Sequence, residues 1–331
     1  MMLLRALTPL AGLVSLAQAG TLGRRRLDVP LICGPERGAH GHMVLQHLWE
    51  PGSVAARDNS WTIDRLWNIK PGASAAEEAC DASRAYDNIT AATVYWNVWD
   101  MVNDWRLMGY LSQTQLEQLM AKVRPIVNSA EATTLLADNG SFDVLATAGY
   151  RDYFEYEEDW DVAKHYGQKY VPISSLQNLH RQLGDARGVE PFLQRAWARD
   201  GTCVGALALD CFKQNVGFER GMEAVAYVHQ LGALITGGHT YQDLADRGIV
   251  PSDAETYARE DVKSALEGRG YLYTGNAVLS CHQDVLVGVK YYFDIEGHFD
   301  SGAYHPAALG SEAEKDGNCP DRVRYLASAG A

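Results

Sequence analysis

Two short segments of the chain place charged side chains beside tryptophans in a pattern that suits acid–base chemistry. They are SWTIDRLW, residues 60–67, and FLQRAWARDGTC, residues 192–203. A general acid, a general base and a cation at such positions transfer protons and neutralise charge in a transition state. The side chains at these positions are Asp64 in the first segment and Arg195, Ala196, Arg199 and Asp200 in the second.

Carboxylates and guanidinium groups are poorly suited to that task near neutral pH. An ordinary aspartate has a pKa of about 3.9, so at pH 7 it is a weak base and carries no proton to donate. Arginine is a fixed planar cation that does not release its proton. Two carboxylates facing a phosphate also repel it, by about 4 kcal/mol for unit charges ~4 Å apart at an effective dielectric constant of about 20. These residue types therefore predict inefficient proton transfer.

The periodicity of the flanking sequence indicates which elements position the two segments. Residues 41–50 and 60–67 are typical of short strands. Residues 91–187 are mostly helical in pattern, and Leu116, Leu119 and Val123 lie on one face of such a helix. Further helices are expected over residues 173–188, 192–201, 217–232 and 252–268, the last opening with a capping box from Ser252 to Glu255. Strands return over residues 284–297 and 298–307, so the pattern predicts an α+β fold.

The N-terminal residues predict an exported protein. Residues 1–19 contain one arginine, an apolar run and a small-residue ending at Ala19, which is typical of a cleaved signal peptide. We expect residues 20–331 to form a single domain that is secreted, either extracellular or in the vacuolar lumen. No later stretch approaches the ~20 apolar residues of a membrane span, so no membrane association is expected. Asn88 and Asn139 begin N-x-[ST] sequons and are expected glycosylation sites.

The cysteines and histidines favour disulfides over metal binding. An even number of cysteines in an exported chain predicts disulfides, in any of 15 pairings, and the chain has no C-x-x-C motif. The histidines His40, His42 and His47 lie close together, but no neighbouring acidic or cysteine side chain completes a zinc site. We therefore expect no metal and no cofactor. The cysteines are Cys33, Cys80, Cys203, Cys211, Cys281 and Cys319.

Composition and charge restrict the possible partners. The chain has 331 residues, of which 47% are hydrophobic and 21% charged, as in ordinary globular proteins. Its formal net charge of −13 opposes general binding to nucleic acids at neutral pH, because such binding depends on lysine and arginine. We expect no DNA partner. Binding to RNA at acid pH, or through a local basic site, stays open.

Several segments in one order resemble the fungal branch of the ribonuclease T2 family. SWTIDRLW is similar to the family's first box, S-W-T-I-H-G-L-W, and FLQRAWARDGTC to its second, F-W-E-H-E-W-N-K-H-G-T-C. The other matching segments are CDASRAYDNIT (residues 80–90), LDCF (209–212), YYFDIEGHFDSGAYHPA (291–307) and NCPDRVRYL (318–326). The resemblance covers residues 30–90 and 190–327. Residues 91–190 look like a helical insertion.

The resemblance implies a fold, a disulfide framework and an activity. It implies a central antiparallel sheet flanked by helices. It implies pairing of Cys80 with Cys203, Cys33 with Cys211, and Cys281 with Cys319. Family members are secreted acid ribonucleases, in which the ribose 2′-hydroxyl attacks the adjacent phosphate and a 2′,3′-cyclic phosphate is left.

The resemblance also assigns roles to positions of this chain. The family's first box carries a catalytic histidine where this chain has Asp64. Its second box carries histidine, glutamate, lysine and histidine where this chain has, in order, Arg195, Ala196, Arg199 and Asp200. Trp67 and Phe192 match positions that contact nucleobases, or alternatively fill the core.

These replacements lead to a hypothesis about structure and a choice among functions. We expect Asp64 and Asp200 to be held by Arg199 and Arg195 in an ion-pair cluster, with Arg65 beside it; the alternative is that they are unselected surface residues. The expected function is binding, to RNA weakly or to a protein partner, without efficient catalysis. The alternatives are an active acid endoribonuclease that recruits other residues, and an extracellular interaction protein unrelated to RNA.

Overall fold

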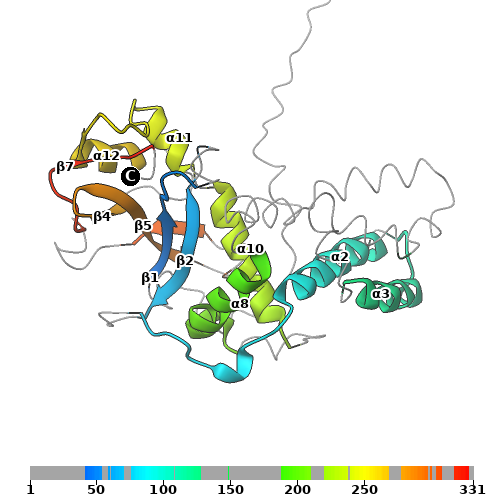
Figure 1. Ribbon diagram of the computed structural model, residues 1–331. Helices are drawn as coiled ribbons and strands as arrows, with labels where there is room; N and C mark the ends of the chain where they lie inside the picture. Colours follow the sequence, from blue (N-terminus) through cyan, green and yellow to red (C-terminus); the bar gives the residue numbers. More distant parts are fainter. Residues whose placement is uncertain are drawn as a thin grey trace, which may run out of the picture.

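A five-stranded antiparallel sheet forms the centre of the molecule in the computed structural model (Figure 1). Its strands run in the order β2-β1-β5-β4, with β6 paired to β5, and β3 and β7 form a separate two-stranded sheet. The strands are β1 (His42–Leu48), β2 (Thr62–Ile69), β3 (Tyr257–Ala258), β4 (Ala277–His282), β5 (Val285–Glu296), β6 (Ala303–Pro306) and β7 (Arg322–Val323).

The helices lie between the first two strands and the last group of strands along the chain. They are α2 (Ile89–Leu107), α3 (Gln113–Val127), α8 (Val189–Arg199), α10 (Met222–Gly237), α11 (Thr240–Ala245) and α12 (Arg259–Glu267), with short 3-10 turns η2 (Ala82–Arg84), η4 (Gly201–Cys203) and η5 (Gly205–Leu207). The structure describes residues 42–53, 59, 61–70, 76–107, 109–127, 148, 188–209, 220–237, 239–267, 277–296, 299, 303–307 and 317–327. This arrangement confirms the α+β prediction.

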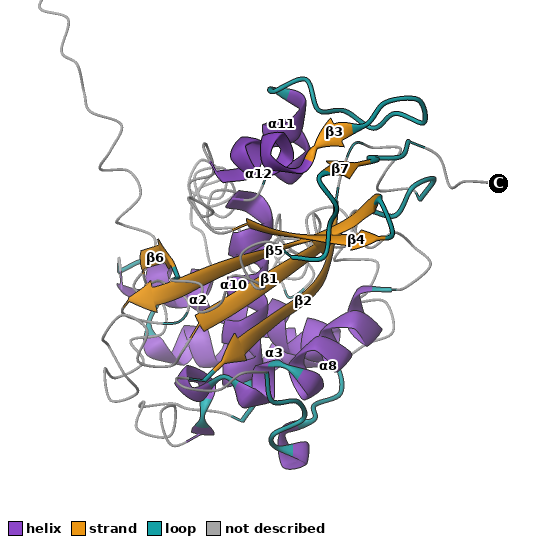
Figure 2. Ribbon diagram, turned by 90° about the vertical axis from the view of Figure 1, so that its left-hand side faces the viewer, coloured by secondary structure: helices purple, strands orange, loops and turns teal. Residues whose placement is uncertain are grey.

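One face of the sheet packs against helices to form the main core. In the sheet register Leu45 pairs with both Leu66 and Tyr291, and all three are buried. Trp197 of α8 and Tyr227 of α10 are fully buried in the same apolar cluster. Figure 2 shows these helices behind the strands, with α11 and α12 at one end. The first box, on β2, and the second box, on α8, therefore both pack against this core.

Helices α2 and α3 build a second apolar cluster of their own. Leu116, Leu119 and Val123 are buried there as predicted, together with Val98 of α2. The first residue of α2, Ile89, belongs instead to the main core. Figure 1 shows the two helices extending to one side of the sheet. The helix expected over residues 173–188 lies almost wholly outside the described residues, and the insertion remains a proposal.

Two features of the C-terminal half differ from expectation. Ser252 does not begin a helix: its hydroxyl accepts hydrogen bonds from the amides of Ala254 and Glu255 in a turn, and α12 begins only at Arg259. Residues 257–258 instead pair with β7, so a long-range strand contact replaces the local helical preference. Strand β4, which pairs along β5, was not anticipated either.

Two of the three implied disulfides are present. Cys80 is bonded to Cys203 and Cys281 to Cys319, each with a Cα–Cα distance of 5.0 Å. Each is expected to stabilise the fold by ~2–4 kcal/mol. The pairing of Cys33 with Cys211 lies outside the described residues.

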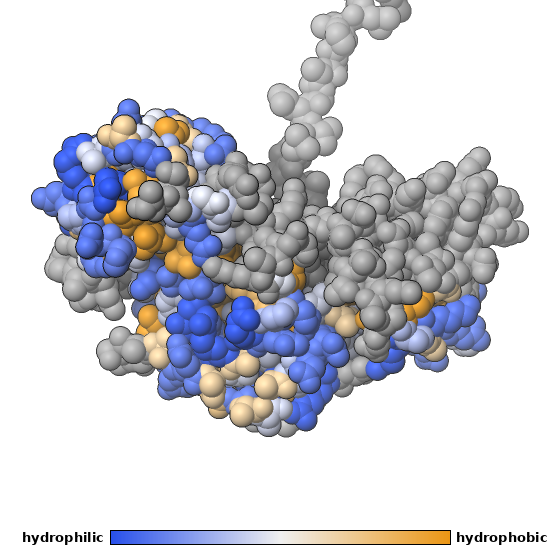
Figure 3. All heavy atoms as spheres, in the orientation of Figure 1, coloured by the Kyte–Doolittle hydropathy of each residue, from blue (hydrophilic) through white to orange (hydrophobic). Residues whose placement is uncertain are grey.

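The described surface is largely hydrophilic in the view of Figure 3, with apolar residues showing where the region of α11 and α12 meets the sheet. Within the described part of the chain, no helix has the length and apolar character needed to cross a bilayer. Asn88 is exposed and immediately precedes α2. The expected signal peptide and Asn139 fall outside the described residues.

A buried histidine links β1, α11 and β5. Nδ1 of His47 lies 2.9 Å from the hydroxyl of Thr240, which lies 2.9 Å from the hydroxyl of Tyr291. Burial lowers the pKa of the His47 imidazole from 6.5 to about 4 and raises the pKa of Tyr291. His47 is therefore neutral in the folded protein at pH values where the unfolded chain is already protonated.

We predict that this histidine makes the fold acid-sensitive. Stability from His47 is fully present above pH 6.5 and is lost as the pH falls toward 4, because the unfolded chain takes up the proton first. A shift of this size amounts to about 3 kcal/mol in the free energy of unfolding. Urea unfolding of His47→Gln should show a shallower loss between pH 7 and pH 4.5. The exposed-histidine control His282→Gln should follow the unmodified protein; parallel curves for all three would disprove the assignment.

Candidate functional site

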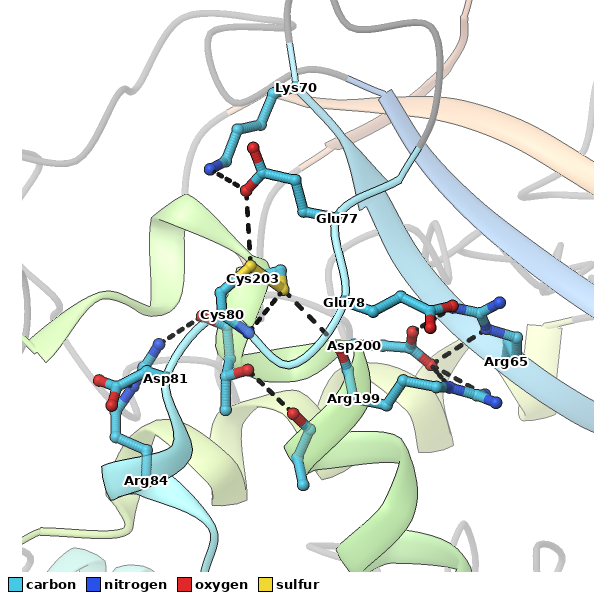
Figure 4. The surroundings of a disulfide bond; sticks show 12 residues. Arg65, Lys70, Glu77, Glu78, Cys80, Asp81, Arg84, Arg199, Asp200 and Cys203 are labelled. Atoms are coloured by element: carbon cyan, nitrogen blue, oxygen red, sulfur yellow. Dashed lines mark hydrogen bonds and ion pairs between the residues drawn. A yellow bond between two sulfur atoms is a disulfide. The ribbon is translucent and has the colours of Figure 1, made fainter.

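The two charged segments meet through a bidentate ion pair (Figure 4). Nη2 of Arg65 on β2 donates to Oδ1 of Asp200 at 2.5 Å, and Nε donates to Oδ2 at 3.3 Å. Asp200 directly follows α8. The planar fork of arginine matches the two oxygens of a carboxylate, and this geometry is among the stronger charge-assisted contacts. The fold thus brings the first and second boxes face to face.

Asp200 is completely buried, and two further charges complete its surroundings. Its side chain has 0% exposure, and its Oδ2 also accepts a hydrogen bond from Nε of Arg199 at 3.0 Å. Nη2 of Arg65 donates in addition to Glu78 at 2.7 Å. We call Arg65, Glu78, Arg199 and Asp200 the Asp200 cluster. It contains two cations and two anions, so the buried carboxylate is neutralised within the protein.

The pKa values of the neighbours reflect the buried charge. Burial acts to lower the pKa of Arg65, but its hydrogen bonds and attraction to Asp200 and Glu78 outweigh this effect and raise it. Burial, followed by the negative charge of Asp200, raises the pKa of Tyr227 well above its usual value. The Tyr227 hydroxyl donates to the carbonyl of Leu66 at 2.7 Å. The cluster is therefore surrounded by groups that keep their protons.

Covalent and backbone contacts hold the cluster in place. The disulfide between Cys80 and Cys203 joins the segment that carries Glu78 to η4, and the amide of Ala79 donates to the carbonyl of Arg199 at 2.7 Å. The buried guanidinium of Arg84 donates to the carbonyl of Thr202 at 2.5 Å. These bonds tie the loop before η2 to the end of α8, so the carboxylate of Asp200 has little freedom to move.

The ion-pair hypothesis is confirmed for one aspartate and wrong for the other. Asp200 is held by Arg199 as predicted, but its second partner is Arg65, not Arg195. Arg195 is exposed on α8, and neither it nor Asp64 forms an ion pair within the described part of the chain. Asp64 has no register partner opposite it, because a bulge separates the pairs on either side. A bulge re-aims its side chain away from a regular strand direction.

The remaining predicted positions are buried. Ala196 is 2% exposed and packs in the main core, as does Phe192. Trp67 is 7% exposed, and the guanidinium carbon of Arg65 lies 4.9 Å from the centre of its ring. Arg65 therefore contacts both the buried carboxylate and a face of the indole. The alternative interpretation, in which these side chains fill the core, fits Phe192. Trp67 lies outside the main core cluster.

Glu78 and Tyr227 were not anticipated as members of this site. For Glu78 a signal existed: the implied bond between Cys80 and Cys203 brings residues just before each cysteine together. For Tyr227 the sequence shows only a tyrosine on an amphipathic helix. Among the described residues, no group of three or more metal-binding side chains is arranged to hold an ion.

We predict that the Asp200 cluster stabilises the fold through Arg65. Arg65→Ala leaves the buried carboxylate with only Arg199, and should lower the free energy of unfolding by about 3 kcal/mol. The matched control Arg195→Ala removes an exposed arginine that has no ion-pair partner among the described residues, and it should change the free energy of unfolding by less than about 0.5 kcal/mol. Asp64→Ala should behave like the control. Urea unfolding at pH 7 measures all three; equal effects of the two arginine substitutions would contradict the prediction.

Comparison with known proteins places this geometry in a family. A model of the ribonuclease T2 family matches residues 154–305. Ribonuclease Trv of Hypocrea rufa is 25% identical over 289 residues, covering 86% of each chain. Ribonuclease T2 of Aspergillus oryzae is 23% identical, covering 80% of this chain and 68% of that protein. A ribonuclease T2-like protein of Aspergillus fumigatus is 31% identical over 285 residues, and this chain spans about half of its length, 48%.

The fold agrees with these relatives. The crystal structure of Actibind, a T2 ribonuclease, superposes with a TM-score of 0.51 at 20% sequence identity, covering 89% of this chain and 90% of that one. The antiparallel sheet with flanking helices is thus the fold that the resemblance implied. On the family match, the relatives and the fold together, the chain belongs to the ribonuclease T2 family.

Proposed function

We propose that this chain is a secreted ribonuclease T2-family protein that binds RNA without cleaving it efficiently. Cleavage by the family chemistry requires a base for the ribose 2′-hydroxyl and an acid for the leaving 5′-oxygen, and imidazole suits both roles. The positions that the family boxes assign to histidine hold Asp64, Arg195 and Asp200 in this chain. Carboxylate and guanidinium side chains are residue types poorly suited to exchanging a proton near neutral pH.

The observation that carries the proposal is the burial of Asp200. A general acid or base must come within hydrogen-bond reach of the reacting oxygen. The carboxylate of Asp200 has 0% exposure, and both of its oxygens accept hydrogen bonds from arginine side chains. A phosphodiester reaching it would have to displace Arg65 and leave the buried carboxylate with Arg199 as its one remaining ion-pair partner among the described residues, which is unfavourable. The position therefore supports structure better than proton transfer.

Binding is supported separately from catalysis. Trp67 and the cationic residues Arg65 and Lys290 lie on strands of the sheet, and stacking on aromatic rings together with phosphate contacts is how single-stranded nucleic acids are bound without sequence preference. The guanidinium of Arg65 beside the Trp67 ring occupies a position where a base would stack. We therefore propose weak binding without the family's base preference. A protein partner is the alternative outcome if RNA does not bind.

The direct test of function is cleavage of yeast RNA, followed on gels at pH 4.5 and pH 7. We predict cleavage near background at both pH values, because each acid–base group typically contributes ~10²–10⁴-fold. Robust cleavage at pH 4.5 would instead favour the active acid endoribonuclease.

A restored variant provides the positive control, and the structure determines its composition. Because Arg65 binds residue 200 and covers Trp67, restoring the histidines alone should leave the site blocked. The full variant, in which Arg65→Gly is included, should cleave at least about tenfold faster than the same variant with Arg65 retained. The full set of changes is Asp64→His, Arg65→Gly, Arg195→His, Ala196→Glu, Arg199→Lys and Asp200→His.

The binding half of the proposal is tested by fluorescence anisotropy with a labelled oligoribonucleotide across a salt series. Contacts to phosphates release counterions, so affinity should fall as salt rises. Absence of binding, or binding that salt does not weaken, would favour an interaction protein unrelated to RNA.

A further inference from the structure

Strand β4 lies at one edge of the five-stranded sheet, beyond β5 (Figure 1). Among the described residues, β5 is the only strand that pairs with it. Residues 277–281 of β4 read AVLSC, a run that contains no charged residue and no proline. An edge strand of this composition presents unpaired amides and carbonyls and pairs readily with a strand of another chain, unless something covers it.

The side chain of Asn318 covers this edge at Cys281. The backbone amide of Cys281 donates to Oδ1 of Asn318 at 2.8 Å, and Nδ2 of Asn318 donates to the carbonyl of Cys281 at 2.8 Å. A neighbouring antiparallel strand would make the same pair of bonds, one to the amide and one to the carbonyl of a single residue. Asn318 therefore takes the place of a partner strand at this point of the edge.

Gly317 brings the backbone of the same segment against a second position of β4. Its φ is +63°, a conformation that favours glycine. A Cβ atom on this residue would lie 2.1 Å from the carbonyl oxygen of Leu279, so a side chain there would collide with the strand. We call Gly317, Asn318 and Cys319 the edge plug. The edge plug thus meets β4 at two residues, Leu279 and Cys281.

Two further contacts hold the segment that carries the edge plug on the β4–β5 hairpin. The disulfide between Cys281 and Cys319 joins it covalently to β4, and both cysteines are buried. Further along the segment, the guanidinium of Arg324 donates to both carboxylate oxygens of Asp284, at 2.8 Å each. Asp284 lies in the turn between β4 and β5. The segment is therefore anchored at two places on the hairpin.

We propose that the edge plug blocks association of this chain with a second copy through their β4 strands. Two identical edges related by a twofold axis can pair as antiparallel strands, and such an interface is self-complementary. The uncharged run at residues 277–281 brings no like charges together in that arrangement. With the plug in place, the amide and carbonyl of Cys281 are already bonded, and the backbone at Gly317 fills the approach to Leu279. The fold carries this device independently of any binding to RNA.

Amide exchange measured by NMR in dilute solution tests whether the plug protects the edge. In the unmodified protein the Cys281 amide should exchange as slowly as the amides that are bonded between β4 and β5. In Asn318→Ala it should exchange at least about fivefold faster, because its hydrogen bond is lost. Rapid exchange of this amide in the unmodified protein would overturn the proposal, whether or not the variant folds.

Sedimentation equilibrium over a range of protein concentrations tests the association. The weight-average mass of Asn318→Ala should rise with concentration and approach about twice that of the unmodified protein. Gly317→Ala, which forces the plug away from β4 by steric collision, should behave likewise. In the matched control Arg324→Gln the segment loses its contact with Asp284, but the plug keeps both bonds to Cys281. The mass of this control should follow that of the unmodified protein.

A charge on the edge separates strand pairing from general destabilisation. Adding Ser280→Lys to Asn318→Ala should return the mass to that of the unmodified protein, because an edge lysine opposes the pairing of strands. Unchanged mass in both Asn318→Ala and Gly317→Ala would show that the proposal is wrong. So would an equal rise in Arg324→Gln, or a rise in Asn318→Ala that the lysine does not reverse.

Discussion

The structure around the two boxes depends on the cost of burying one carboxylate. An isolated ionised carboxylate inside a protein is unfavourable by several kcal/mol, and only well-oriented partners compensate for it. Asp200 has 0% exposure at the junction of α8 and η4, and Arg65 and Arg199 supply the opposing charge. The bidentate geometry from β2 then fixes the distance between the sheet and the end of α8. Glu78 and the neighbouring disulfide hold the same junction from outside.

This arrangement changes what the scaffold is suited to do. A ribonuclease T2-family cleft needs mobile protons and an accessible stacking surface. Arg65 contacts a residue at each of these two positions, because it binds Asp200 and lies over the ring of Trp67. Under the proposed function, this one side chain links loss of proton transfer to reduced access to the indole.

Much of the fold was predictable because its signals are local. Residues 41–50 and 60–67 are typical of short strands and predicted β1 and β2, and the spacing of Leu116, Leu119 and Val123 predicted α3. The two described disulfides followed from the family resemblance. The start of α12 was not predictable, because pairing of Tyr257 with Val323 is a contact between distant segments. The prediction of the second ion-pair partner of Asp200 failed for the same reason. Only the three-dimensional arrangement of β2 and α8 decides that Arg65, and not Arg195, reaches Asp200.

The most direct measurement is mass spectrometry of the RNA ends produced when purified, unmodified protein is in excess over a short oligoribonucleotide at acid pH. If Asp200 is a buried structural anion, the oligonucleotide is cleaved no more than in the control without protein. Accumulation of 2′,3′-cyclic phosphate ends in proportion to protein would show that the site still transfers protons and would contradict the account.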